Sequence, residues 1–157
     1  MIEVSERIEV PAAPRAVWEI LSNPRAVVEC VEGAELGEQH DDGSYDARMV
    51  VKFGPAKVSF KQRFTLELDQ AAMSGRVESR GKDNQGGTRV KTLMTFKVTE
   101  GVAPGSAAIP IDAQVEISGK LASLVETGAN IVVKRMTVDF TEKLAAKVGG
   151  TAVAGDK

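Results

Sequence analysis

Few residues of this chain combine the types and spacing that catalysis requires. His40 is the only histidine and Cys30 the only cysteine, so the chain lacks the parts for a zinc site built from Cys and His. A nucleophile also needs a base beside it, and His40 lies in Gln39-His40-Asp41-Asp42-Gly43, a run of turn residues. We expect a solvated hairpin loop there, and the Asp41-Asp42 pair is typical of the turn rather than of a metal site.

The glycine-rich segment from Gly81 to Gly87 does not have the features of a phosphate-binding loop. It lacks the P-loop spacing, the strand-to-helix context and the terminal Lys-Ser/Thr pair. Its turn residues instead predict a connection between two strands. We therefore expect neither a bound cofactor nor a metal.

Composition narrows the class of protein further. At 157 residues the chain is expected to form one domain, and its net charge of −2 gives no overall field for nucleic acid. Aromatic residues make up only 4 %, too few for the stacking platforms of single-strand binders. Met1 is followed directly by Ile2-Glu3-Val4 without a secretory signal, and no apolar run reaches the roughly 20 residues of a membrane span. These features predict a cytoplasmic protein.

The apolar pattern predicts a sheet followed by one long helix. Residues 2–10 alternate as a strand, and residues 14–21 and 25–31 form two short helices. Between Ser44 and Ser118 five runs alternate with period two, and their short connections predict an antiparallel meander. Pro110 in the last run suggests an edge or a bulge. The pattern then becomes helical to about Val148, so we expect a domain over 1–148 and a disordered tail over 149–157.

One helix is too narrow to cover the apolar face of so many strands. The inward side chains that it leaves uncovered form either a packed core or a pocket, and this choice decides the function. Small or polar inward residues such as Ala47, Ser79 and Thr92 interleave with large ones such as Phe64 and Met94. Such a pattern fits either a close approach of the helix over a packed core or an apolar pocket for a small molecule. The pattern alone leaves both alternatives open.

The outward side chains form a charged face. A solvated face of mixed charge is the ordinary interpretation, since Glu67, Asp69, Glu78, Asp112 and Glu116 are among its members. A docking surface is the alternative, because the basic residues concentrate on three consecutive strands. These basic residues are Lys57, Lys61, Arg63, Arg76, Arg80, Arg89, Lys91 and Lys97.

Four segments carry a resemblance to a known family. They are Val10-Pro11-Ala12-Ala13-Pro14 with Val17-Trp18-Glu19-Ile20-Leu21-Ser22-Asn23-Pro24; Cys30-Val31-Glu32-Gly33-Ala34-Glu35; Phe53-Gly54-Pro55; and Gly119-Lys120-Leu121-Ala122-Ser123-Leu124. Over about residues 2–148 the chain resembles the CoxG family of carbon monoxide dehydrogenase subunits, within the START-like (SRPBCC) superfamily. This resemblance implies an α+β helix-grip fold, in which a seven-stranded antiparallel sheet curves around a long C-terminal helix and two short helices follow strand 1. Glu32 stands where the family usually has proline.

The resemblance also implies a function. It implies an apolar cavity between sheet and helix that binds a lipid-like molecule such as a quinone, and recruitment of a molybdenum-containing CO dehydrogenase or related hydroxylase to the membrane. It carries over no catalytic residue. Peripheral contact with the inner face of the cell membrane is part of the expectation, although the tail is too short to favour insertion.

The leading hypothesis is therefore a binding protein without catalytic activity. Parity and helical face select fifteen cavity candidates: Trp18, Leu21, Met49, Val51, Phe53, Phe60, Phe64, Met94, Phe96, Ile111, Val115, Val125, Gly128, Val132 and Met136. The alternative is a START-like cyclase, hydratase or hydrolase, for which Gln62, Ser79, Thr92 and Asp139 are the polar candidates. None of them forms an acid–base pair in the sequence, and Asp139 in a cavity beside Gln62 or Thr92 would favour this alternative. A third hypothesis is a protein adaptor that uses the basic face.

Overall fold

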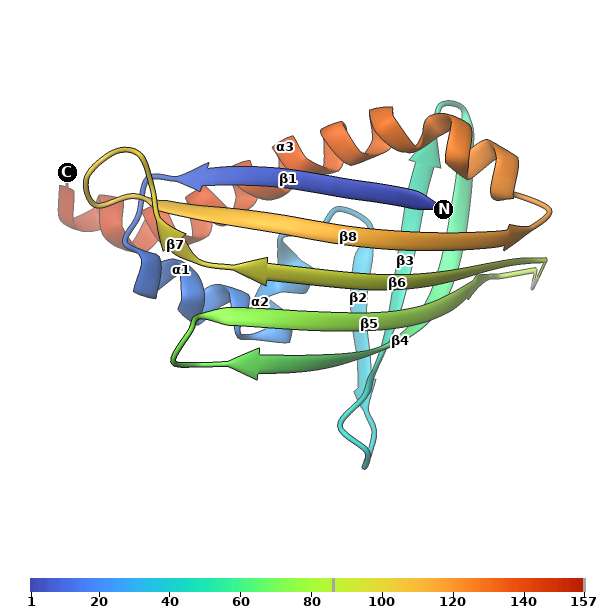
Figure 1. Cartoon of the computed structure of the whole chain (residues 1–157), viewed down its shortest axis with the longest axis horizontal. Helices are drawn as coiled ribbons and strands as arrows, with labels where there is room; N and C mark the ends of the chain where they lie inside the picture. The colour runs from blue at the N-terminus through green and yellow to red at the C-terminus, as the bar shows by residue number, and fades with distance from the viewer. Residues whose placement is uncertain (86, 157) are drawn as a thin grey trace.

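The computed structural model describes residues 1–85 and 87–156, with side chains described as far as Val148 (Figure 1). The predicted α+β helix-grip architecture is confirmed. The described strands are β1 (Ile2–Val10), β2 (Ala34–Gln39), β3 (Tyr45–Phe53), β4 (Ala56–Asp69), β5 (Ser74–Asp83), β6 (Thr88–Lys97), β7 (Thr99–Glu100) and β8 (Ala107–Gly119), and the helices are α1 (Pro14–Leu21), α2 (Pro24–Glu29) and α3 (Ala122–Asp156).

The strands form one antiparallel sheet with the order β1-β8-β6-β5-β4-β3-β2. Consecutive strands from β2 to β6 are neighbours, as the predicted meander requires, and β1 closes the row beside β8. In Figure 1 α3 lies behind the sheet along its long dimension, while β2 and β3 run across the direction of β5, β6 and β8. The sheet is therefore strongly curved, with α3 on its inner side.

Pro110 interrupts a strand ladder, and the expectation of an edge or a bulge is wrong. β8 lies between β1 and β6. β6 and β7 pair with β8 in one unshifted register, in which Phe96 opposes Ile111 and Thr99 opposes Ala108. Between these two stretches Lys97 and Val98 do not pair with β8, so the ladder is interrupted opposite Pro110 and Ile109. Pro110 has no N–H to donate. β7 thus continues the line of β6 along β8. With β6 and β7 taken together, the sheet has the seven strands expected.

The two short helices begin where their sequences predict. Pro14 occupies the first turn of α1, where a missing N–H leaves no hydrogen bond unmade. Asn23 caps α2, since its side-chain oxygen accepts hydrogen bonds from the backbone N–H groups of Arg25 (3.1 Å) and Ala26 (3.4 Å). Val17, Trp18 and Leu21 form the buried face of α1.

Strand β5 extends further than its turn residues suggested. Gly81, Lys82 and Asp83 continue the strand and pair with β4, so the turn begins only at Asn84. Glycine is needed at position 81 because a Cβ there would lie 2.7 Å from Cγ of Gln62 and 2.8 Å from the carbonyl oxygen of Lys61. The close pairing of β4 and β5 overrides the local turn preference, and it places Lys82 on the sheet.

Helix α3 contacts two separate cores along its length. Val125 and Val132 belong to what we call the hairpin core, which also contains Val51, Phe53, Val58 and Phe60. Leu144 and Val148 belong to the α1 core, together with Ile8, Val10, Val17, Trp18, Leu21, Val98 and Ile109. The apolar face that α3 presents therefore changes along the helix, from the hairpin core to the α1 core. The side chains of residues 149–157 are not described. The expected disorder of this tail stays a prediction.

Gly33 provides a test of the turn that leads from α2 into β2. Its φ is +80°, and a Cβ there would overlap the carbonyl oxygen of Val50. The N–H of Val50 also donates a 2.9 Å hydrogen bond to the carbonyl oxygen of Gly33. We expect Gly33→Ala to lower the free energy of unfolding by about 2–4 kcal/mol, because strain and overlap act together. Urea unfolding measures the difference.

Gly43 is the matched control. Its φ is +90°, but a Cβ there meets nothing within 4 Å. Gly43→Ala should therefore cost only the conformational strain, about 1 kcal/mol. Equal losses at both positions would show that the contact with Val50 adds nothing.

Candidate functional site

The inner face of the sheet is half-buried between its two cores. Six of the inward apolar side chains on β4, β5, β6, β8 and the edge strand β1 belong to neither the hairpin core nor the α1 core, and water reaches each of them. We call these residues the inner band: Val4, Phe64, Leu66, Val77, Met94 and Val115. A contiguous apolar surface that water can reach is a candidate binding site for a hydrophobic molecule.

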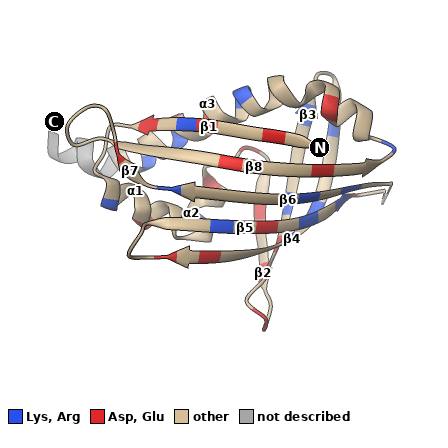
Figure 2. Cartoon of the chain, in the orientation of Figure 1, with Lys and Arg blue, Asp and Glu red and all other residues tan. Residues whose placement is uncertain are grey.

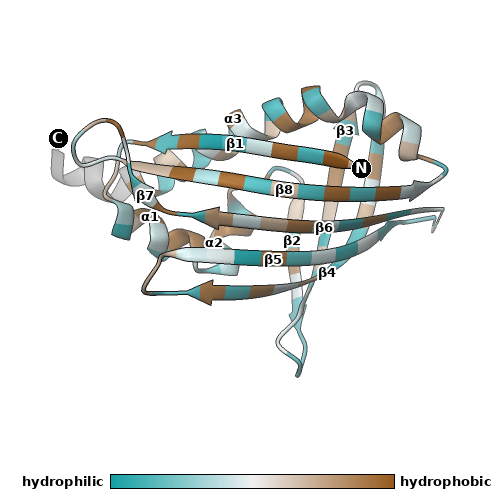
Figure 3. Ribbon diagram, viewed as in Figure 1, coloured by the Kyte–Doolittle hydropathy of each residue, from teal (hydrophilic) through white to brown (hydrophobic). Residues whose placement is uncertain are grey.

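Strand register aligns the inner band into rows across the sheet. Leu66 opposes Val77, which opposes Met94, and Ala113 of β8 connects this row to Val4. This row is apolar throughout. Figure 3 shows brown and teal residues alternating along β1 and β8. Because successive side chains of a strand point to opposite faces, such an alternation gives a strand one apolar and one polar face.

The neighbouring row adds polar groups at one border of the inner band. Phe64 opposes Ser79, Ser79 opposes Thr92, and Thr92 opposes Val115. The Ser79 hydroxyl donates a 3.3 Å hydrogen bond to the side-chain oxygen of Gln62. These hydroxyl and amide groups can orient the polar end of a ligand whose apolar part lies along the first row.

The position of α3 explains why the inner band is accessible. The helix backbone approaches β1, β3 and β8 closely, and it makes far fewer close approaches to the central strands β4, β5 and β6. Gly128 permits the approach on the β3 side, where a Cβ would lie 3.1 Å from the ring of Phe53. The helix thus rests on strands at the two sides of the sheet and leaves the centre less covered.

The fifteen cavity candidates fall into three groups. Phe64, Met94 and Val115 lie in the inner band. Trp18 and Leu21 are part of the α1 core, with Phe96 and Ile111 packed against it. The remaining candidates, Met49, Val51, Phe53, Phe60, Val125, Gly128, Val132 and Met136, lie in or beside the hairpin core.

Leu66, Val77 and Val4 are inner-band residues that the candidate set omitted. Each has the inward parity, so the alternation already contained the signal. Their common row follows only from the strand register, which aligns Leu66 and Val77 with Met94 and, through Ala113, with Val4 on the edge strand β1. Parity identifies a face, whereas register identifies a position on it.

His40 is less solvated than the turn sequence predicted. Its Nε2 lies 2.9 Å from Oδ1 of Asp46 and 2.8 Å from Nη2 of Arg63. The turn itself is as expected, since Asp42 accepts hydrogen bonds from the N–H (2.9 Å) and hydroxyl (2.6 Å) of Ser44. His40 is thus held on the outer face of the β2–β3 hairpin and is not placed as a base for the inner band.

The other titratable candidates also have structural partners. Asp139 forms a 2.9 Å ion pair with Lys143, one turn along α3. Burial raises the pKa of the Cys30 thiol, which keeps it protonated and unreactive. Among the described residues no three His, Cys, Asp or Glu side chains gather to hold a metal ion.

Comparison with protein families identifies the group to which this protein belongs. The sequence profile of CoxG, a carbon monoxide dehydrogenase subunit, matches residues 7–149. The chain belongs to the CoxG family. No curated protein matches it in sequence. None of the described helices has both the length and the apolar character needed to cross a membrane.

Solved structures share the fold at low sequence identity. A conserved protein from Geobacillus kaustophilus has a TM-score of 0.81 and 17 % identity, covering 96 % of this chain and 97 % of its own. A START superfamily protein from Mycobacterium smegmatis has a TM-score of 0.61 and 18 % identity, covering 95 % and 98 %. The Zhui aromatase/cyclase from Streptomyces sp. R1128 has a TM-score of 0.62 and 16 % identity, covering 94 % and 93 %. These neighbours establish the START-like fold.

The His40–Asp46 contact makes a prediction about pH. The hydrogen bond from His40, followed by the charges of His40 and Arg63, lowers the pKa of Asp46. Since the pKa is depressed in the folded state, its contribution to stability is present above the unfolded-state value of about 3.9 and is lost as pH falls through the folded-state value. We expect His40→Ala to raise the pKa of Asp46 toward its ordinary value.

Carboxyl-carbon NMR titration of Asp46 measures this shift. Arg63→Ala is the comparison variant, because Arg63 lies 3.5 Å from the same carboxylate and contributes less to lowering the pKa. A larger shift in Arg63→Ala than in His40→Ala would contradict the assignment of the hydrogen bond as the main cause.

Proposed function

We propose that this protein binds a hydrophobic small molecule with a polar end, a lipid or quinone-like compound, on the inner band. The observation that carries the proposal is the row of half-buried apolar side chains between two separate cores. A chain buried there gains about 0.8 kcal/mol for each CH₂ removed from water. Membership of the CoxG family and the START-like fold support the same kind of ligand.

The polar border of the inner band supports binding rather than catalysis. Gln62, Ser79 and Thr92 can donate and accept hydrogen bonds, which suits a carbonyl or hydroxyl group on the ligand. This group contains no carboxylate, imidazole or thiol, so it offers no acid–base pair near neutral pH. Asp139, the one carboxylate among the candidates of the enzyme hypothesis, is engaged with Lys143.

A role in recruitment follows from the family. We propose that the loaded protein associates with a molybdenum-containing CO dehydrogenase, or a related hydroxylase, and brings it to the membrane. The outer side of α3 offers a contact surface, because Leu124, Ile131 and Val138 are exposed (37 %, 73 % and 57 %) and recur every seventh residue. Such spacing places them along one line of the helix.

Decylubiquinone is a direct probe of the inner band. Trp18 is the only tryptophan, and its ring centroid lies 6.2 Å from that of Phe96, two residues along β6 from Met94. A quinone bound on the inner band should quench Trp18 fluorescence. Met94→Lys should weaken binding tenfold or more, because a charged ammonium group would be placed against the apolar chain of the ligand (about 1.4 kcal/mol per factor of ten).

Thr95→Lys is the matched control. Thr95 is the next residue of β6, lies on the outer face and is exposed, so the same substitution there should leave binding unchanged. Thermal unfolding confirms that both variants fold. Equal affinity in the two variants, or no quenching in the wild type, would overturn the proposed site.

The recruitment proposal predicts an effect of the α3 surface. Ile131→Ser should weaken binding to purified molybdenum CO dehydrogenase about fivefold to tenfold, since it removes an exposed apolar side chain from the contact. Biolayer interferometry measures the affinity. Val102→Ser alters a residue that is 86 % exposed in the loop before β8, and it should have no effect. Unchanged affinity in Ile131→Ser would exclude this face as the contact.

A further inference from the structure

The outer face of the sheet carries two rows of basic side chains directly opposite one another. In the first row Arg48 opposes Lys61, Lys61 opposes Lys82, and Lys82 opposes Arg89. In the second row Arg63 opposes Arg80, and Arg80 opposes Lys91. We call these seven exposed residues the basic rows. Like charges in directly opposed positions destabilise a sheet, so the sequence maintains an arrangement that folding alone disfavours.

The other end of the same strands follows the opposite rule. There Glu67 of β4 opposes Arg76 of β5, and Nη2 of Arg76 lies 2.6 Å from Oε1 of Glu78. Asp112 of β8 accepts a 2.9 Å hydrogen bond from the hydroxyl of Ser5. In Figure 2 blue residues gather on β3, β4, β5 and β6 at one end, whereas red and blue alternate toward the other. The like-charge arrangement is therefore a local feature.

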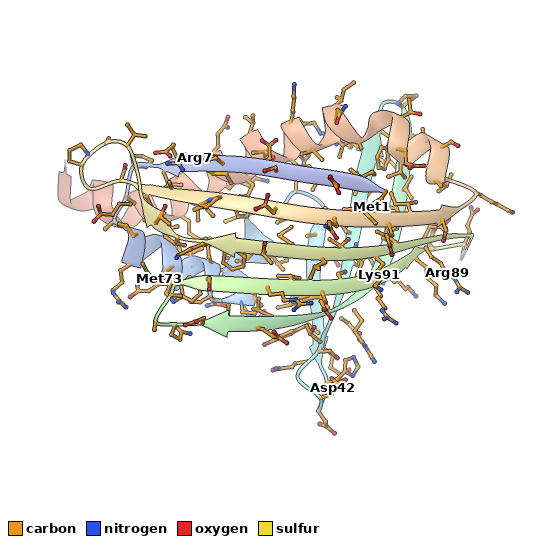
Figure 4. All side chains as sticks on the ribbon, in the orientation of Figure 1. Met1, Arg7, Asp42, Met73, Arg89 and Lys91 are labelled. Atoms are coloured by element: carbon orange, nitrogen blue, oxygen red, sulfur yellow. The ribbon has the colours of Figure 1, made fainter. Side chains whose placement is uncertain are left out.

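All of the basic rows except Lys91 line a groove of about 670 Å³ across β2, β3, β4, β5 and the start of β6. Of the seven side chains only Arg63 has a carboxylate within 4.0 Å in the described part of the chain, namely Asp46 at 3.5 Å. Figure 4 shows Arg89 and Lys91 near the start of β6, where the strand borders this groove. Six positive side chains thus face solvent without a salt-bridge partner among the described residues.

We propose that the groove binds an acidic segment of a partner protein. Four adjacent strands at a spacing of about 4.8 Å span about 14 Å. A helix with its side chains is about 10–12 Å across, and an extended segment is narrower, so the basic rows have room for a single peptide segment. Carboxylates on such a segment would neutralise the opposed cations and remove the repulsion between them.

The surrounding charges favour a narrow partner over a flat anionic bilayer. Glu78 and Glu116 lie on the same outer face beside the basic rows, and Glu35 and Asp46 lie at the other border of the groove. A bilayer would extend over these carboxylates as well as the cations, whereas a single segment contacts the floor of the groove alone. The basic side chains lie on the opposite face of the sheet from the inner band, and of the residues that line the groove only Gln62 also belongs to the polar border of the inner band.

Octaglutamate is the probe, with octaglutamine as the uncharged control. Amide NMR shifts at low ionic strength should move on β3–β6 with octaglutamate only, and added salt should reverse them. Lys82→Gln should weaken binding about fivefold. Arg76→Gln, on the same strand and face but paired with Glu78, should change the affinity less than about twofold.

Stability measurements separate a lost site from a damaged fold. Lys82→Gln should raise the unfolding temperature, because it removes repulsion from Lys61 and Arg89, whereas Arg76→Gln should lower it slightly. Quenching of Trp18 by decylubiquinone should be the same in both variants as in the wild type.

Three results would overturn the proposal. The first is equal loss of octaglutamate binding in Lys82→Gln and Arg76→Gln, which indicates general charge attraction. The second is unchanged octaglutamate binding in Lys82→Gln. The third is binding to phosphatidylglycerol vesicles that depends on Lys82 together with no binding of octaglutamate, which would assign the rows to a membrane surface.

Discussion

The inner face of the sheet depends on how a single helix covers it. α3 approaches β1, β3 and β8 and buries one core at each end of its path, the hairpin core and the α1 core. Side chains in the centre, such as Val77 and Met94, keep contact with water although they are apolar. The exposed apolar surface is a consequence of this geometry, and it is what gives the CoxG fold in this chain a place for a hydrophobic ligand.

The two faces of the sheet differ in the chemistry of their side chains. On the inner face the apolar row through Leu66 and Met94 borders the polar row through Ser79, which suits an amphipathic ligand. On the outer face the paired charges around Arg76 contrast with the opposed cations around Lys82. Because alternate residues of each strand serve opposite faces, one set of strands can hold a ligand and contact a protein without either set of side chains obstructing the other.

Much of the fold was predictable because its signals are local. Period-two alternation identified the strands, Pro14 and Asn23 marked the starts of α1 and α2, and the resemblance to the CoxG family was confirmed. Where local signals failed, a neighbouring strand decided the outcome: pairing with β4 kept Gly81 in β5, and the ladder with β1 placed Pro110 in a central strand. Turn and strand propensities do not contain these long-range pairings.

The sequence by itself determined which face of each strand is apolar and that most of the charged strand residues face outward. Only the tertiary structure decided that Trp18 and Phe53 are core while Phe64 and Met94 are accessible, and that Lys61, Lys82 and Arg89 oppose one another. The reason is physical: parity is a property of one strand, whereas burial and charge opposition depend on register and on where α3 rests, which the residues of several elements set together.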